Sequence, residues 1–183
     1  MEVEKFHSSG SRILGVIGVL LALAFAAALA SDGLDGSDAL IVCVLGFFAV
    51  LVWSAMVRPQ LRLAGDRLVV RNMLTSLSFP VAAVEAVEAR QVVVLRAGGR
   101  KFISAAVSKS LYQVLKDNRG VARDVKAYPN FVEDRIRSRS EDERAKLGLR
   151  LGEVPLDLRR DPAWPEIALL ALFAVGVVVF LFV

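Results

Sequence analysis

Three uninterrupted apolar runs divide the chain. Residues 13–30, 39–57 and 167–183 contain 18, 19 and 17 residues without a charged side chain. As helices they would be about 25–29 Å long, close to the thickness of the hydrocarbon core of a bilayer. The pattern therefore predicts three transmembrane helices.

The charges that flank these runs predict their orientation. The segment 31–38, between the first two runs, carries three aspartates and no Lys or Arg. Four arginines follow the second run closely, namely Arg58, Arg62, Arg67 and Arg71. The positive-inside rule then predicts a multi-pass protein of the inner (plasma) membrane, in which the N-terminus and residues 57–166 are cytoplasmic and the C-terminus is extracytoplasmic.

Small residues recur at every fourth position of the first run. These are Gly18, Ala22, Ala26 and Ala30. Such a row lets another helix approach closely, so it predicts packing against a neighbouring helix.

The first run also fits a second interpretation, as a cleaved signal peptide. Lys5 and Arg12 precede it, and Ala28-Leu29-Ala30 resembles a cleavage site. The 18-residue run is longer than the usual apolar region of about 7–15 residues, which favours a retained helix. The orientation of the rest of the chain is the same in both interpretations.

Between Gln60 and Ala106 the pattern changes to short runs of Val, Leu and Phe separated by turn residues, which is typical of β-strands. Strands are predicted at 60–64, 68–73, 75–79 and 101–105, with one bent strand or two strands in 84–94. Gly65-Asp66 and Gly98-Gly99 supply turns. We expect five to seven strands in one antiparallel sheet or barrel.

A helix is predicted to follow the strands at 109–118. Ser108 is a candidate N-cap, and Gly120 lies just past the end. Leu111, Val114 and Leu115 would lie on one face and pack on the sheet.

Three stretches of this region resemble the bacterial pleckstrin-homology (PH) domain family, particularly its actinobacterial low-molecular-weight-antigen type. They are LRLAGDRLVVRN (61–72), SFPVAAV (78–84) and VVVLRAGGRKF (92–102). The resemblance covers roughly 58–115 and departs at Val81-Ala82, where many relatives place a Trp after the Pro. It implies a PH-like barrel closed by a C-terminal helix, without catalytic chemistry. Lipid-phosphate binding is not implied, because no matching basic loop is present.

Residues 121–166 are predicted to form a charged helix and a linker. Asn130 and Glu133 fit a capping box, and ten of the fourteen residues from 133 to 146 are charged. This helix would be solvated beyond its first turn and supported by three i,i+4 ion pairs: Glu133 with Arg137, Arg139 with Glu143, and Asp142 with Lys146. Glycines and prolines make 148–161 a linker.

The sequence thus predicts a membrane α+β protein. Three transmembrane helices carry a cytoplasmic PH-like antiparallel sheet or barrel, with its C-terminal helix, inserted between the second and third helices. The expected division is a tail and helical hairpin (1–57), a PH-like domain (58–120), the charged helix and linker (121–166) and the last transmembrane helix (167–183).

Composition removes most catalytic chemistries. The chain is 55% hydrophobic and holds one Cys and one His, which excludes an intramolecular disulfide, a cysteine-rich zinc site and His-based metal clusters. Cys43 lies within an apolar run, where a thiol behaves as a small apolar side chain. Since no ionisable residue falls inside the runs, transport by this chain alone is not expected. We expect no enzyme activity, cofactor or metal.

The predicted cytoplasmic part, 57–166, holds 21 Lys or Arg against 14 Asp or Glu. Its basic residues alternate with acids and are not interleaved with aromatic residues, so we expect attraction to anionic lipids and no binding to nucleic acid. The candidates for lipid head-group contact are the arginines nearest the apolar runs: Arg58, Arg62, Arg67, Arg159 and Arg160.

The leading hypothesis is a non-enzymatic membrane-anchored PH-like protein that acts as a scaffold or accessory subunit. Its expected partners are membrane lipids and either another membrane protein or further copies of itself. The alternative is a PH-like module that senses anionic lipids at the inner membrane surface. The sequence offers no candidate reagent for an enzyme.

Overall fold

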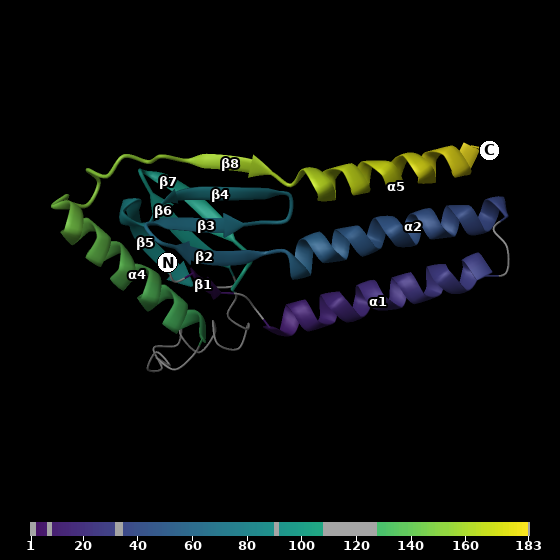
Figure 1. The fold of residues 1–183 in the computed structure, drawn as a ribbon, viewed down its shortest axis with the longest axis horizontal. Coiled ribbons are helices and arrows are strands. Elements are labelled where there is room, and N and C mark those ends of the chain that lie inside the picture. The colour runs from purple at the N-terminus through teal and green to yellow at the C-terminus, as the bar shows by residue number, and fades with distance from the viewer. Residues whose placement is uncertain (1–2, 7–8, 32–34, 90–91, 108–127, 183) are drawn as a thin grey trace, which may run out of the picture. The chain divides into compact units, whose positions relative to one another are not determined.

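The chain forms two compact units in a computed structural model that describes residues 3–6, 9–31, 35–89, 92–107 and 128–182. The β-domain comprises Met1–Ser8 and Pro59–Asp161, and the helical unit comprises Ser9–Arg58 and Pro162–Val183. Together they contain three long apolar helices and antiparallel sheets, which confirms the predicted α+β class (Figure 1).

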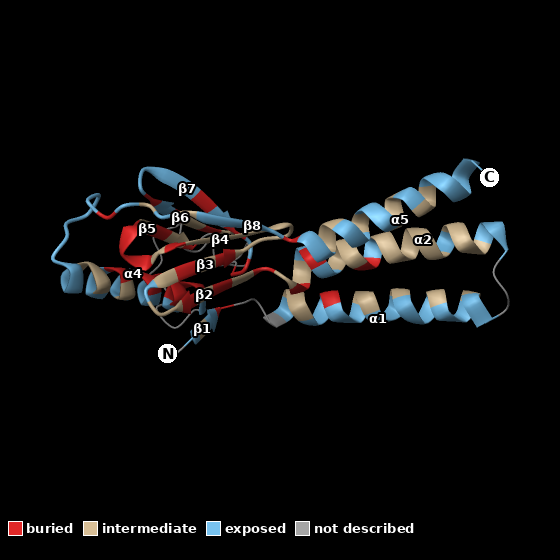
Figure 2. Cartoon of the chain, turned by 45° about the horizontal axis from the view of Figure 1, so that its top comes forward, coloured by how far each residue is buried: buried red, intermediate tan, exposed pale blue. Residues whose placement is uncertain are grey.

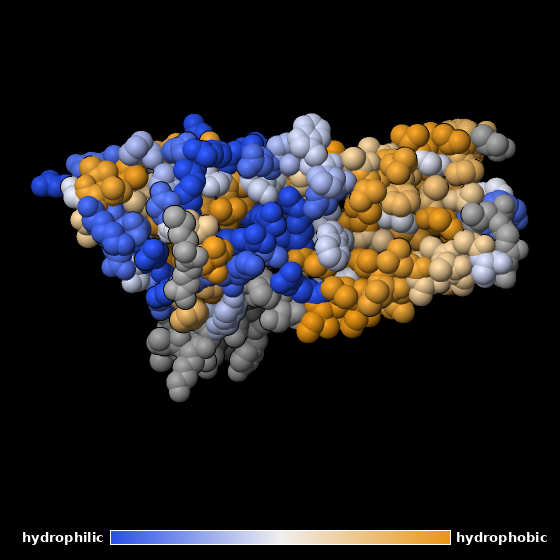
Figure 3. Space-filling view, viewed as in Figure 1, coloured by the Kyte–Doolittle hydropathy of each residue, from blue (hydrophilic) through white to orange (hydrophobic). Residues whose placement is uncertain are grey.

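The helical unit consists of α1 (Ser9–Ser31), α2 (Gly36–Val52) and α5 (Trp164–Phe182), and α2 continues as a π-helical turn, η1 (Trp53–Val57). Each of the three has the length and hydropathy required to cross a membrane, with mean hydropathies of 2.7, 2.7 and 2.5. Hydrophobic residues cover nearly all of the visible surface of this unit (Figure 3). The helices begin before the predicted runs, because caps and polar first turns belong to a helix without being apolar. Asp35, for example, caps α2 by accepting a hydrogen bond from the Asp38 N–H at 2.9 Å.

Helix α2 lies between α1 and α5 and packs against both (Figures 1 and 2). On the α5 side the contacts depend on glycine. A Cβ added to Gly46 would collide with the ring of Phe173, and one added to Gly176 would lie 2.7 Å from Cys43 Sγ. The absence of a side chain at Gly46 and at Gly176 therefore lets α2 and α5 approach closely.

The α1 side uses the predicted row of small residues in part. Gly18 lies against α2, where an added Cβ would be 3.7 Å from Val52 Cγ1. Ala22 and Ala26 are half-buried, whereas Ala30 is exposed. Gly15, which the row did not include, makes a tighter contact, because a Cβ there would lie 2.9 Å from Met56 Cβ. The neighbouring helix is therefore α2 of the same chain.

The β-domain holds two antiparallel sheets, where the sequence predicted one sheet or a barrel. The first has the order β1 (Val3–Phe6), β2 (Gln60–Ala64), β3 (Arg67–Arg71), β4 (Thr75–Pro80) and β8 (Arg159–Pro162). The second contains β5 (Val84–Ala89), β6 (Val93–Ala97) and β7 (Arg100–Ser104). A buried 3-10 turn, η2 (Val81–Ala83), follows Pro80 and passes the chain from one sheet to the other.

Both sheets contribute to one hydrophobic core. Alternate residues of β2, β3, β6 and β7 point inward, and Leu61, Leu68, Phe79 and Leu95 are fully buried. Phe79 stacks on Phe102 from the other sheet, with ring centroids 4.9 Å apart. Figure 2 shows the buried stretches of these strands in red.

Helix α4 (Tyr128–Leu147) packs on β5 and η2 and completes this core. Val132 and Ile136 are fully buried. The predicted capping box is wrong, because the helix begins before Asn130 and Glu133 points into the domain. The Glu133 carboxylate accepts a hydrogen bond from the Ala89 N–H at 3.2 Å. The helix predicted at 109–118, with Ser108, Leu111, Val114, Leu115 and Gly120, lies outside the described residues.

Helix α4 contains two of the three predicted ion pairs, and the third has a different partner. Glu133 pairs with Arg137 at 3.3 Å and Arg139 with Glu143 at 3.4 Å. Lys146 pairs with Glu143 at 2.8 Å instead of with Asp142, so the two basic residues share one carboxylate. The helix is not solvated all round, since its inner stripe continues to the buried Ser140.

Residues 148–161 are not a free linker. Val154 is buried, and Leu156 and Leu158 pack against the core. Between them, Asp157 pairs with Arg67 of β3 at 2.7 Å. The compact domain thus extends beyond the predicted limits of 58–120, because apolar residues at alternate positions attach this segment to the sheet.

The Arg67–Asp157 pair makes the stability of the domain depend on pH. The hydrogen bond from Arg67 lowers the pKa of Asp157 below its ordinary 3.8. The unfolded chain then binds more protons in acid, so the stabilisation is present above pH 3.8 and is lost as the pH falls through the lower, folded pKa. We expect Asp157→Asn to destabilise the full-length protein in detergent at pH 7, and we expect its effect to shrink as the pH is lowered below 3.8. Thermal melting over this pH range measures this.

Asp142→Asn is the matched control, because Asp142 is an exposed aspartate on α4. Equal effects of the two substitutions at pH 7 would show that the Arg67 pair contributes no stability.

Candidate functional site

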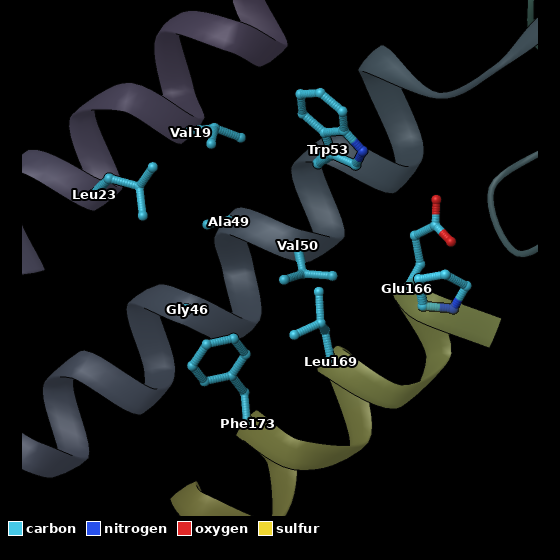
Figure 4. Close-up of a pocket in the computed structure, with 10 residues that line it drawn as sticks. Val19, Leu23, Gly46, Ala49, Val50, Trp53, Glu166, Leu169 and Phe173 are labelled. Carbon is cyan, nitrogen blue, oxygen red and sulfur yellow. The ribbon is translucent and has the colours of Figure 1, made fainter. Parts of the chain in front are cut away.

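An apolar groove runs along the helical unit. Its floor is one face of α2, formed by Gly46, Ala49, Val50 and Trp53, which follow the i, i+3, i+4, i+7 spacing of a helix. Its walls come from the flanking helices, with Val19 and Leu23 on α1 and Pro165, Glu166, Leu169 and Phe173 on α5 (Figure 4). The cavity volume is about 350 Å³.

The groove exists because of the size of the residues on its floor. Gly46 has no side chain and Ala49 has a single methyl group, so the surface of α2 is low between its neighbours. Phe173 fits over Gly46 and forms one wall. Helices α1 and α5 pack on opposite sides of α2, and between them the floor ranges from the buried Ala49 to the exposed Trp53.

One end of the groove is polar. Glu166 is the single charged residue among those that line it, and its Oε1 accepts a hydrogen bond from Arg58 Nε at 2.8 Å. The two side chains are only 11% and 19% exposed. Removing one partner of such a buried pair leaves an uncompensated charge, which typically costs about 3–5 kcal/mol. The pair therefore fixes the end of α2 and η1 to the start of α5.

Sequence reasoning missed Glu166. The apolar run predicts a helix that begins at Ile167, whereas α5 begins at Trp164 and has Glu166 in its first turn. A proline followed by an acidic residue is a helix-start pattern, since proline suits the first turn and a carboxylate suits the positive end of the helix dipole. Pro165-Glu166 could have revealed it.

The five arginines predicted to contact lipid head groups differ in their contacts and in their exposure. Arg58 pairs with Glu166 in the helical unit. Arg62 donates to Gln60 Oε1 at 2.7 Å, and Arg67 contacts Ser78 and Asp157. Arg159 lies 3.6 Å from Asp157 with its side chain 69% exposed, and Arg160 is also exposed. Of the five, only Arg159 and Arg160 keep most of their surface open to a lipid.

The groove has the chemistry of a packing surface. Its lining offers apolar contacts and one carboxylate that already has a cationic partner. Among the residues that the structure describes, no group of three or more His, Cys, Asp or Glu side chains is placed to hold a metal ion. The arrangement can hold an apolar chain or a helix against α2.

Comparison with protein-family models, curated protein sequences and solved structures finds no match to this chain. The function of the chain must therefore be inferred from the geometry of the groove and of the β-domain.

Proposed function

We propose that this chain is a non-enzymatic, membrane-anchored accessory protein that receives a transmembrane helix of another membrane protein in its groove. The observation that carries the proposal is the open face of α2, apolar along its length and bordered by a helix on each side. A fourth helix would turn the three-helix layer into a four-helix bundle.

The floor of the groove favours a helix as the occupant. Helices in membranes associate through small residues, which let backbones approach. Ala49, at the centre of the floor, has a single methyl group, and the Phe173 ring covers Gly46 beside it. The floor runs over about two helical turns, from Gly46 to Trp53, beside Val19 and Leu23 on one side and residues from Pro165 to Phe173 on the other. An elongated, apolar and shallow site suits a helix better than a compact polar ligand.

Photo-crosslinking in intact cells tests this function. A photoreactive amino acid at Val50, on the groove floor, should give a discrete protein adduct that is lost when Ala49→Phe fills the groove. The matched control is Phe48, which is 56% exposed on α2 and does not line the groove. Lipid adducts alone from Val50, or the same products from both positions, would contradict the proposal.

The orientation follows the flanking charges. We propose that α1, α2 and α5 cross the inner membrane with the 31–38 hairpin outside and the β-domain in the cytoplasm. In a Cys43→Ala background, Ser37→Cys should react with an impermeant maleimide in intact cells, whereas Ser138→Cys should react only after lysis. Both serines are exposed, so accessibility within the fold does not bias the comparison. Labelling at residue 138 but not at residue 37 would reverse the topology.

We further propose that the β-domain is PH-like. Two antiparallel sheets that share one core, covered by α4, fit the barrel with a closing helix that the resemblance implies. In this proposal the domain is a scaffold and has no catalytic role. Arg159 and Arg160, exposed directly before α5, favour the alternative of anionic-lipid sensing. Replacing both with Glu should reduce the preference for anionic lipid only under that alternative.

We infer that α1 is retained in the mature protein. Strand β1 precedes α1 and places Phe6 in the core of the β-domain. Cleavage after Ala30 would remove a core side chain together with an edge strand, so the signal-peptide interpretation is disfavoured.

A further inference from the structure

Strand β1 occupies an edge of the first sheet. It pairs antiparallel with β2 over four positions, from Val3 opposite Ala64 to Phe6 opposite Leu61. The other edge of β2 is taken by β3. Thus β1 alone covers this row of backbone donors and acceptors, which is the kind of edge to which extended peptides add.

The two faces of β1 differ in what they contact. Phe6 is 4% exposed within the core, and Glu4, two residues earlier on the same face, binds Arg135 of α4 with an Nε–Oε2 distance of 2.9 Å. Val3 and Lys5 point to the opposite face and are exposed. A segment that binds to β2 as β1 does would therefore place an acidic residue and, two positions later, an aromatic residue against the domain. The residues next to each would face away from it.

Among the described residues, β1 is held by its ladder with β2, by one buried side chain and by one half-exposed ion pair. An edge strand of four residues with a single buried side chain opens more easily than the central strands of the sheet.

We propose that the edge of β2, together with the Phe6 site and Arg135, is a binding site for extended peptide segments of the form acidic-x-aromatic. The N-terminal strand of the chain occupies this site at rest and acts as an autoinhibitory contact. A partner segment of the same chemistry binds by displacing β1. This inference is independent of the groove.

A synthetic peptide with the sequence of residues 2–7, EVEKFH, is the probe. Binding of the fluorescein-labelled peptide to the detergent-solubilised full chain is followed by fluorescence anisotropy. We expect a variant lacking residues 2–6 to bind at least tenfold more tightly than the intact chain, whose own strand competes. Peptides with Ala in place of the Phe, or of the Glu that corresponds to Glu4, should bind at least tenfold more weakly. A peptide with Ala in place of Lys should bind unchanged.

A locked variant provides the matched control. Lys5 and Arg62 are opposite residues of the β1–β2 ladder, and such pairs have Cα atoms about 4.5–5.5 Å apart, within the range of a disulfide. Lys5→Cys with Arg62→Cys, in a Cys43→Ala background, should fix β1 and abolish peptide binding when oxidised. Reduction should restore the binding of the intact chain.

Two results would overturn the proposal. One is equal binding of the peptide to the locked and deleted forms, which would place the peptide elsewhere. The other is the absence of binding to the deletion variant. If that variant has lost its fold, the peptide should restore its thermal transition, because a ligand of the native state stabilises it. Failure to restore the transition also contradicts the proposal.

Discussion

Replacing Phe79 with alanine is expected to lower the free energy of unfolding of the β-domain by about 3–5 kcal/mol. Phe79 is fully buried on β4 and stacks on Phe102 of β7, so its ring joins the two sheets. Truncation removes this contact and leaves a cavity where two separate sheets meet. Chemical denaturation of the full-length protein in detergent, followed by near-UV circular dichroism, measures the change.

Phe131→Ala is the matched control, because Phe131 lies on α4 with 53% of its surface exposed. Its effect should stay below about 1 kcal/mol, as is usual for surface substitutions. If the two substitutions had equal effects, the sheets would not share the core described above.

The second large effect is expected in the helical unit. Gly176→Cys should form a disulfide with Cys43 in nearly every molecule after mild oxidation. The position of a Cβ at residue 176 is 3.6 Å from Cys43 Cβ, within the range of natural disulfides. Mass spectrometry of the intact protein, with and without reductant, detects the loss of two hydrogens, and alkylation counts the remaining thiols.

Ala171→Cys is the control for this experiment. It lies on the same helix with its side chain exposed, so its thiol should remain free. Crosslinking at residue 171 but not at residue 176 would mean that α5 presents a different face to α2. Gly176 makes the close contact with α2, whereas Ala171 is exposed.

Local patterns were enough to predict the elements with strong signals of their own. The alternation of Leu61 and Leu63 with Arg62 predicted β2, and its bounds agree with the structure. The glycine turns were predicted for the same reason, since Gly65 and Gly98 adopt positive φ. The three apolar runs predicted the three long helices, because hydropathy over about 20 residues is difficult to produce in any other way.

Elements defined by their partners could not be predicted in this way. Strands β1 and β8 have four residues each, and β8, with the sequence RRDP, has no apolar alternation. They are strands because the edges of β2 and β4 supply hydrogen bonds. The length of the inner face of α4 was underestimated, because Val132 and Ile136 form only a short stripe in a highly charged helix, whereas burial continues to Ser140.

The candidate site could not be predicted from the sequence, because it depends on how three helices are arranged in space. Gly46 and Ala49 are unremarkable in an apolar run, and they become the floor of a groove only because α1 and α5 stand on either side of them. The row of small residues on α1 did indicate a packing face. No pattern in the sequence states that the partner of this face is α2 of the same chain.

The positions of its strands along the chain also determine the order in which the first sheet can form. Its ion pairs join residues far apart in the chain: Glu4 and Arg135 are separated by 131 positions, and Arg67 and Asp157 by 90 positions. The β2–β4 meander is local and can form as soon as it is synthesised, whereas such distant pairs delay the completion of a fold. Strand β8 ends just before α5, so the edge of β4 stays unpaired until the ribosome has reached the last helix. Completion of the β-domain therefore nearly coincides with the synthesis of α5, the last helix of the chain.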